Sequence, residues 1–390
     1  MKILVVGSGA REHALCWAIS ASPLCDTLYC APGNAGIEED AICVPLNIDD
    51  IQEITQFSVD KSIDFVVVGP EGPLVSGLVD DLSSAGIKAF GPSAAAAQLE
   101  GSKSFTKEFC KRHNIPTAAY ARFTSCDEAI SYIRHQGAPI VIKADGLAAG
   151  KGVTVAHTEA EAENAVIAAL RDKSFGEAGN EVVIEEFLIG EEASFHVLVD
   201  GKTAVPLATA QDHKAVGDGD VGLNTGGMGA YSPAPIVDER MHKKILNEVM
   251  QPTMHGLINE GSPYLGFLYA GLMIKDGELK VLEFNCRFGD PETQPILLRL
   301  KSSLVELCIA AIDDDLDNHE IEWTKQHACG VVIASEGYPE NYTKNNEVKI
   351  QATDLDGVKL FHAGTKLDQN KIFTSGGRVF CMTALGETLE

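Results

Sequence analysis

Residues 282–292 read LEFNCRFGDPE. They follow an apolar run at 268–274, a Lys275-Asp276-Gly277 turn and a second apolar run at 279–282. Two apolar runs joined by an Asp-Gly turn are typical of a β-hairpin. The quoted residues therefore occupy the end of the second strand of a predicted hairpin and the turn that follows it.

Three polar side chains of this stretch are spaced by two. Because side chains alternate along a strand, Glu283, Asn285 and Arg287 are predicted to project from one face. A carboxylate and an amide offer hard oxygen ligands that suit Mg²⁺, and an adjacent guanidinium suits a phosphate or a carboxylate. The alternative is a strand end with solvated charges, but the Gly-Asp-Pro turn at 289–291 argues against it.

Composition limits the class of protein. The chain has 390 residues, 45% of them hydrophobic, so two or three domains with real cores are expected. The net charge is −25 and no cluster of Lys and Arg stands out, so nucleic acid is not an expected partner. The apolar runs are short and interrupted by Gly and Pro, so no membrane span is expected either.

The cysteines indicate the compartment. Ten are scattered along the chain without a CxxC pair, which disfavours a zinc site or a dithiol redox centre. Such a set is typical of a reduced, cytoplasmic protein. Met1 and Lys2 lead directly into an apolar strand, so no cleavable signal is expected. No heptad or long exposed apolar helix is evident, so we expect a monomer or a weak dimer.

The order of predicted elements divides the chain into three domains of an α/β protein. Strands alternate with helices over residues 1–101, which predicts a Rossmann-like N-terminal domain with a parallel sheet. Residues 102–324 are predicted to form a central domain, with a small lobe inserted at about 123–188. Residues 325–390 read as a β-rich C-terminal domain. Residues 386–390 look like a helix just starting, so we expect either a longer natural chain or an unusually short last domain.

A glycine loop at residues 7–12, GSGARE, follows the first strand and opens a helix. Backbone N–H groups and the positive helix end at such a turn suit a phosphate. The dinucleotide fingerprint fails, because Glu12 replaces the third glycine and no acid follows the second strand. A nicotinamide oxidoreductase is therefore disfavoured, and a phosphorylated sugar is the better hypothesis. The remaining alternative is a turn that only packs helix on sheet.

A second glycine loop at 146–152, GLAAGKG, differs from a Walker loop in spacing, and strand residues follow it instead of a helix. A glycine-rich β-hairpin flap over a triphosphate fits better. Lys143 ends the preceding apolar strand and is predicted to point at a nucleotide, because a buried lysine without a partner is costly. In the segment 185–192, EEFLIGEE, Glu185 could accept from an adenine amino group and Glu192 from ribose hydroxyls, unless this segment is an ordinary acidic connector.

Taken together, these motifs resemble the ATP-grasp ligases, and most closely the phosphoribosylamine–glycine ligase family of purine biosynthesis. The resemblance spans nearly the whole chain in the family's order. It rests on GSGAREHAL at 7–15, APGNAG at 31–36, GPEGPL at 69–74, KADGLAAGKGV at 143–153, QDHK at 211–214, NTGGMGA at 224–230 and 283–292. One departure concerns the metal: the strand 270–274 carries no further acid, which leaves Glu283 and Asn285 as the expected ligands.

The resemblance implies a reaction. ATP, glycine and 5-phosphoribosylamine would give glycinamide ribonucleotide, ADP and phosphate through glycyl phosphate. Mg²⁺ or Mn²⁺ would be held by Glu283 and Asn285, and ATP would be a co-substrate. Arg287, Lys143 and Asp212 are the implied catalytic residues, although Asp212 is nearly as well explained as an acid at a hairpin end.

The implied binding residues form two groups. The ATP group contains Lys103, Lys143, Gly150, Lys151, Gly152, Glu185, Phe187, Leu188 and Glu192. The substrate group contains Gly9, Arg11, Asn34, Gly36, Glu71, Asp212, Asn224, Gly226, Gly227, Met228 and Arg287. Two other functions remain open, namely another ATP-grasp ligase such as a carboxylase, and a nucleotide-sensing protein that is not an enzyme.

Overall fold

The computed structural model describes residues 1–147, 152–219, 221–351 and 355–389. Its N-terminal part is a parallel five-stranded sheet in the order β3-β2-β1-β4-β5. The strands are β1 (Lys2–Gly7), β2 (Thr27–Pro32), β3 (Ile42–Cys43), β4 (Phe65–Val68) and β5 (Lys88–Phe90). The helices are α1 (Ala10–Ser20), α2 (Ile51–Lys61), α3 (Glu71–Val75), α4 (Leu78–Ser84) and α5 (Ala94–Gly101), with the 3₁₀ turn η1 (Ile37–Glu39). The predicted parallel α/β sheet is confirmed.

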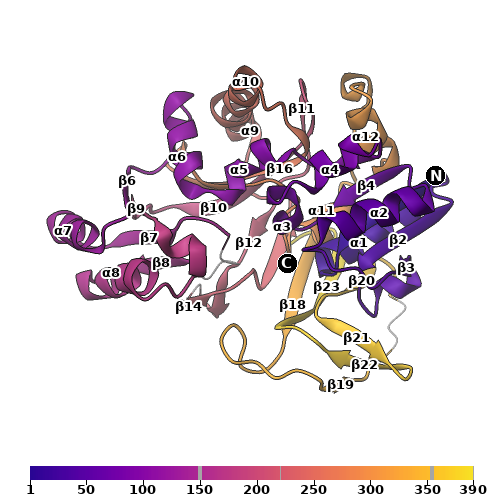
Figure 1. Cartoon of the computed structure of the whole chain (residues 1–390). Helices are drawn as coiled ribbons and strands as arrows, with labels where there is room; N and C mark the ends of the chain where they lie inside the picture. Colours follow the sequence, from indigo (N-terminus) through magenta and orange to yellow (C-terminus); the bar gives the residue numbers. More distant parts are fainter. Residues whose placement is uncertain (148–151, 220, 352–354, 390) are drawn as a thin grey trace.

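A small lobe projects from the rest of the molecule, at the left of Figure 1. Its antiparallel sheet has the order β6-β9-β7-β8. The strands are β6 (Tyr120–Phe123), β7 (Ile140–Ala144), β8 (Val153–Ala156) and β9 (Val182–Glu186). Around them lie α7 (Cys126–Gln136), α8 (Glu159–Val166), η2 (Ile167–Arg171) and η3 (Gly176–Asn180). The lobe has a hydrophobic core of its own, so it can hold its shape as a unit.

The central part is an antiparallel sheet in the order β11-β10-β16-β17. Its strands are β10 (Glu191–Asp200), β11 (Ala204–Pro206), β16 (Leu265–Lys275) and β17 (Glu278–Asn285). Its helical segments are α6 (Lys103–Arg112), α9 (Glu239–Ile245), η4 (Leu246–Met250), α10 (Gln251–Asn259), α11 (Thr293–Arg299), α12 (Leu304–Ile312) and η5 (Leu316–Asn318). The predicted hairpin at 268–282 is confirmed, with Asp276 and Gly277 both at positive φ, as a tight two-residue turn requires.

The third large sheet, β12-β15-β18-β23-β20, joins strands far apart in the sequence. Its strands are β12 (Gln211–Asp212), β15 (Gly229–Ser232), β18 (His327–Ala334), β20 (Val358–His362) and β23 (Arg378–Gly386). Small sheets beside it contain β13 (Ala215–Gly217), β14 (Val221–Asn224), β19 (Glu347–Val348), β21 (Thr365–Asp368) and β22 (Lys371–Thr374). β18, orange in Figure 1, pairs with β15 on one side and with β23 on the other. The C-terminal strands are therefore hydrogen-bonded to the central part of the chain.

The N-terminal glycine loop closes around one buried acid. Glu12 is 2% exposed, accepts a hydrogen bond from the Gly9 backbone N–H at 2.6 Å and pairs with Arg11 at 2.5 Å. A Cβ atom at Gly7 or Gly69 would overlap the Glu12 side chain. The two glycines thus let strands β1 and β4 close on a carboxylate that is fixed by its own hydrogen bonds.

This packing gives a first prediction. Gly69→Ala should lower the free energy of unfolding by about 1–3 kcal/mol, because Glu12 cannot move without losing its partners. Gly72→Ala is the matched control, since nothing lies within 4 Å of its Cβ position in α3 and alanine favours helix. Urea unfolding of both variants measures the difference. Equal stability of the two variants would contradict the close packing around Glu12.

Candidate active site

A cavity of about 460 Å³ lies where the N-terminal domain, the small lobe and the central sheet meet. Most of the predicted site residues line it, although they come from distant parts of the chain. They are Arg11, Glu71, Lys103, Lys143, Gly152, Glu185, Phe187, Leu188, Glu192, Asp212, Asn224, Gly226, Glu283, Asn285 and Arg287. Gly150 and Lys151, which were also predicted to bind ATP, fall outside the described residues.

The hairpin strand β17 contains a β-bulge near its end, and this bulge determines which side chains face the cavity. Gly271 pairs with Glu283 and Leu272 with Val281, so Leu282 is an extra residue in β17. Its carbonyl accepts a hydrogen bond from Lys143 Nζ at 3.0 Å. Val281 and Phe284 remain in the core, whereas the Glu283 side chain keeps 40% of its surface exposed. The bulge therefore separates core side chains from those that face the cavity.

Glu283 and Asn285 both line the cavity. Burial alone would raise the pKa of Glu283, but Lys214, Lys143 and Lys103 outweigh it and lower the pKa to about 2. Glu283 is therefore a carboxylate at neutral pH. The Asn285 side chain has no hydrogen-bond partner among the described residues. An anionic and a neutral oxygen donor, neither of them committed to a hydrogen bond there, fit a hard divalent cation.

Two buried lysines share one glutamate at the floor of the cavity. Lys107 and Lys143 each lie 2.9 Å from a different carboxylate oxygen of Glu185. All three side chains are less than a tenth exposed. Thr117 accepts a further hydrogen bond from Lys107 at 2.7 Å. This arrangement leaves a positive excess beside the cavity, which suits phosphate oxygens.

The glycine loop at 146–152 joins two strands of a hairpin, because β7 and β8 pair antiparallel with Lys143 opposite Val153. Below its first residue, Lys103 donates to the Gly146 carbonyl at 2.8 Å. Burial lowers the pKa of Lys103 from its usual value, an effect that Glu283 opposes. Lys103 therefore holds the base of the loop by a hydrogen bond and lies close enough to Glu283 to interact with its charge.

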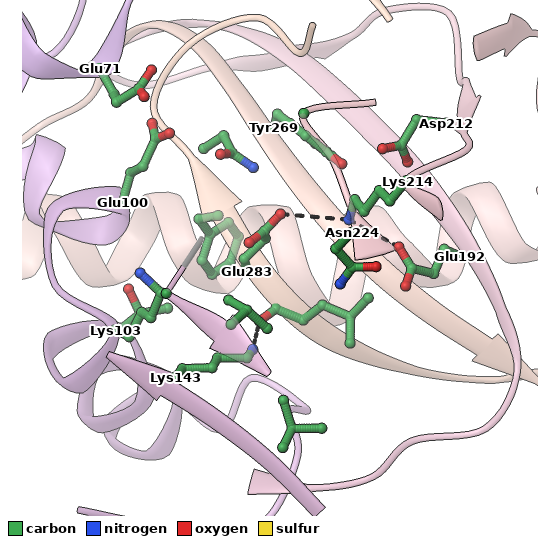
Figure 2. Close-up of a pocket in the computed structure, with 18 of the residues that line it drawn as sticks. Glu71, Glu100, Lys103, Lys143, Glu192, Asp212, Lys214, Asn224, Tyr269 and Glu283 are labelled. Carbon is green, nitrogen blue, oxygen red and sulfur yellow. Dashed lines mark hydrogen bonds and ion pairs between the residues drawn. The ribbon is translucent and has the colours of Figure 1, made fainter. Parts of the chain in front are cut away.

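On the opposite side, Lys214 lies between two acids, as Figure 2 shows. Its Nζ is 2.9 Å from Glu192 and 3.7 Å from Glu283. Burial raises the pKa of the neighbouring Asp212 to about 7, although Lys214 opposes this rise. Asp212 is thus a carboxyl group that changes charge near neutral pH.

Arg287 connects the hairpin to the N-terminal domain. Its guanidinium lies 3.2 Å from Glu71 and 2.8 Å from Glu100. Burial would raise the pKa of Glu71, but Arg287 and Arg11 lower it to about 2. Burial raises the pKa of Glu100 to about 7 despite the same arginine. Arg287 thus lies between Glu71, which is ionised at neutral pH, and Glu100, which titrates near neutral pH.

The remaining predicted residues that the structure describes do not line the cavity, namely Gly9, Asn34, Gly36, Gly227 and Met228. Asn34 donates to the carbonyls of Ser8 and His362, both at 2.8 Å, and accepts from the Gly36 N–H at 2.9 Å. Gly9 lies at the entrance to α1. Gly227 and Met228 belong to the loop that precedes β15. Asn34 and Gly36 therefore shape the N-terminal loop through hydrogen bonds within the protein.

Sequence reasoning missed several residues of the wall, namely Glu100, Lys107, Lys214, Tyr269, Glu292 and Arg378. Lys214 belongs to the QDHK motif at 211–214, and Glu292 belongs to the stretch 283–292. Their closeness in sequence to Asp212 and Arg287 could have identified them as site residues. Lys107 lies one helical turn after Lys103 in α6, which places the two on neighbouring parts of one face. Arg378 had no such signal, because only the tertiary fold brings β23 to the cavity.

A central antiparallel sheet, a small lobe with a glycine-rich hairpin and a cavity between them lined by lysines and carboxylates define the ATP-grasp class of ligases. Three models of the phosphoribosylglycinamide synthetase family match the chain: the N domain at residues 1–100, the ATP-grasp (A) domain at 101–293 and the C domain at 328–390.

Known proteins agree with these matches. The phosphoribosylamine–glycine ligases of Vibrio parahaemolyticus and Salmonella typhi are 55% and 56% identical to this chain over 394 residues, covering 100% of it and 92% of each relative. A crystal structure of phosphoribosylamine–glycine ligase from Thermotoga maritima matches with a TM-score of 0.88 and 32% identity, over 100% of this chain and 93% of that one. The chain belongs to the phosphoribosylglycinamide synthetase family.

More distant structures share the fold alone. A biotin carboxylase from Campylobacter jejuni matches with a TM-score of 0.76 and 15% identity, over 99% of this chain and 87% of that one. In the described ranges, no helix is long and apolar enough to cross a membrane. Within the same ranges, no group of three His, Cys, Asp or Glu side chains is arranged to hold a metal.

The shared glutamate gives a second prediction. Glu185→Gln should lower the free energy of unfolding by about 3 kcal/mol, because Lys107 and Lys143 would stay buried without a counter-charge. Glu186→Gln is the matched control: Glu186 is the next residue, is 40% exposed and pairs with Lys280, so about 1 kcal/mol or less is expected. Denaturant unfolding distinguishes the two, and similar losses in both variants would refute the role of Glu185.

Proposed function

We propose that this chain joins glycine to 5-phosphoribosylamine at the expense of ATP, giving glycinamide ribonucleotide, ADP and phosphate. The family membership over the whole chain supports this activity. The observation that carries it at the level of the site is the single cavity shared by Glu283, Asn285, Lys103 and Lys143. An acid and an amide facing lysines there suit a triphosphate with its cation.

The chemistry needs activation because a carboxylate is a poor electrophile. In the first step, a carboxylate oxygen of glycine attacks the γ-phosphorus of ATP, which forms glycyl phosphate and releases ADP. In the second, the amine nitrogen of the sugar attacks the carbonyl carbon, phosphate leaves with its bonding electrons, and the new amide nitrogen loses a proton. The protein contributes mainly orientation and charge stabilisation.

Glu283 and Asn285 would hold the divalent cation, which we propose to be Mg²⁺ or Mn²⁺. When bound, the cation neutralises charge on the β- and γ-phosphate oxygens. Lys103 and Lys143 would bind the same phosphates, and Gly152 would belong to the flap that excludes water from the acyl phosphate. Together these groups hold the transferred phosphoryl group in a dry, positive environment.

The nucleoside would lie against the segment between β9 and β10. Glu185 would accept from the adenine amino group, the backbone of Phe187 and Leu188 would contact the ring edge, and Glu192 would bind ribose hydroxyls. All four residues line the cavity next to the lysines. The Glu192 carboxylate already has Lys214 as a partner, which fixes its position for this contact.

The acceptor substrates would occupy the other half of the cavity. Arg287 would stabilise the transferring phosphoryl group or the glycine carboxylate, and Asp212 would pair with the glycine ammonium. The sugar phosphate would lie at the N-terminal loop and at the loop that precedes β15. The residues proposed for this half are Gly9, Arg11, Asn34, Gly36, Glu71, Asn224, Gly226, Gly227 and Met228.

The reaction would take place in the cytoplasm, in agreement with the ten free cysteines. The enzyme would be a monomer or a weak dimer. The activity itself is tested by coupling ADP release to a spectroscopic readout while glycine, sugar amine and divalent cation are omitted in turn. We expect ADP formation to require all three. ADP release that ignores glycine and amine, or ATP binding without turnover, would favour another ATP-grasp ligase or a nucleotide sensor.

The metal role gives a third prediction. Glu283→Gln should lower kcat by about 10²–10³-fold, because the variant loses the charge that holds the cation against the phosphates. The fold should be unaffected, since Glu283 lies at a strand end and faces the cavity. Glu278→Gln, on the same strand but 83% exposed, should retain wild-type turnover. Turnover of the Glu283 variant at the wild-type rate would remove the metal role.

A fourth prediction concerns pH. Because the pKa of Asp212 is about 7, the side chain is neutral below that pH and a carboxylate above it. The KM for glycine should therefore fall about tenfold as the pH rises from about 6 to about 8. Asp212→Asn should raise this KM and flatten its pH profile, with the KM for ATP as the internal reference. A variant that keeps the wild-type profile would exclude Asp212 from binding the ammonium.

A further inference from the structure

The C-terminal domain sends one arginine into the cavity. Arg378 begins strand β23, and its side chain is 21% exposed. Its Nη2 lies 2.7 Å from Asp290 Oδ2. Its Nη1 donates to the carbonyl oxygens of Gly226, Asp290 and Gly227 at 2.6, 2.8 and 3.3 Å. Arg378 thus joins the loop before β15 to the turn that follows β17.

The same loop is held from its other side by a second residue of the C-terminal domain. The Gly226 backbone N–H donates to the Tyr338 hydroxyl at 3.0 Å. Arg378 and Tyr338 therefore satisfy the carbonyl and the N–H of one glycine. An exposed loop would leave these groups to water, so two directed side-chain contacts select one loop position.

Close packing reinforces this position. Gly227 has a φ of +109°, and a Cβ atom there would overlap the ring of Pro291. The loop thus presses directly on the Asp290-Pro291 turn. Asp290 in turn faces the N-terminal glycine loop, because a Cβ atom on Gly9 would lie 3.6 Å from Asp290 Oδ2. We call the contacts that Arg378 and Tyr338 make with this loop the clamp. The clamp lies next to the part of the site proposed for the sugar phosphate.

The clamped loop is also connected to the charged wall. The Thr225 N–H and hydroxyl both donate to the Lys214 carbonyl at 2.8 Å, and the Met228 N–H donates to the His213 carbonyl at 2.7 Å. The Lys214 ammonium faces Glu192 and Glu283. A continuous series of contacts therefore leads from the C-terminal domain to the proposed cation site.

We propose that Arg378, assisted by Tyr338, is a positioning residue that holds the 224–229 loop in the conformation that receives 5-phosphoribosylamine. The C-terminal domain thereby completes the sugar-amine side of the active site. This inference rests on the proposed function for the identity of the ligand. The clamp itself rests on the contacts of Arg378 and Tyr338.

The kinetic test compares Arg378→Met, Arg378→Lys and Tyr338→Phe with the wild-type chain, with the sugar amine formed in the assay from ribose 5-phosphate and ammonia. Arg378→Met should lower kcat/KM for the amine about 100-fold, mainly by raising the KM for the amine, whereas the KM for ATP stays within about threefold. Arg378→Lys should recover about tenfold of this loss, and Tyr338→Phe should lose about fivefold.

Tyr342→Phe is the matched control. Tyr342 is a ring neighbour of Tyr338, and its hydroxyl makes no hydrogen bond within the described part of the chain. It should behave as wild type. A merely structural role of Arg378 would reduce the active fraction and so lower kcat, while leaving the KM for the amine unchanged. That result, or wild-type kinetics in Arg378→Met, would overturn the proposal.

A second measurement does not depend on activity. Hydrogen exchange of the segment 224–229, with Mg·ADP bound, should be faster in Arg378→Met and in Tyr338→Phe than in wild type or Tyr342→Phe. Unchanged exchange would refute the clamp even in an active enzyme. If wild type gives no ADP that depends on glycine and amine, the proposed function fails and the sugar amine is lost as the ligand, whereas faster exchange would still support the clamp.

Discussion

The extra residue in β17 is the constraint on which the site depends. Leu279 and Val281 face the core, so strict alternation would send Glu283 into the core as well. The bulge at Leu282 prevents this, and Phe284 takes the core position instead. A carboxylate in that core would be costly without a partner. One inserted residue therefore frees Glu283 for the cavity and turns the Leu282 carbonyl towards Lys143.

Charges around the cavity are held before any ligand binds. Lys143 has Glu185 and a carbonyl, Lys214 has Glu192, and Arg287 has Glu71 and Glu100. Each of these cationic side chains is thus fixed by protein groups and needs little rearrangement to bind a phosphate or an acyl phosphate. Such preorganised dipoles and charges are the main source of catalysis when the protein provides no nucleophile. Burial has a second effect, since it raises the pKa of Glu100 and that of Asp212 to about 7.

Much of this arrangement was predictable from the sequence, because the signals are local. The Asp276-Gly277 turn predicted the hairpin, and the glycine loop at residues 7–12 predicted the turn from β1 into α1. The motifs also predicted the family, through their order along the chain. The bulge was not predictable, since the pattern of Glu283 and Asn285 looks the same with or without it. The contacts of Arg378 and the pairing of β15 with β18 were missed for another reason. They join segments about a hundred residues or more apart, and a local sequence pattern does not predict such contacts.

We propose that one cavity holds a divalent cation between the end of β17 and a lysine-bound triphosphate. A crystal structure of the complex with Mn²⁺ and ADP, with diffraction data collected at the manganese absorption edge, would locate this cation. We expect anomalous density whose nearest protein atoms are the side-chain oxygens of Glu283 and Asn285, with the ADP phosphates on its other side. Manganese bound elsewhere, or ADP phosphates remote from Lys143, would contradict it.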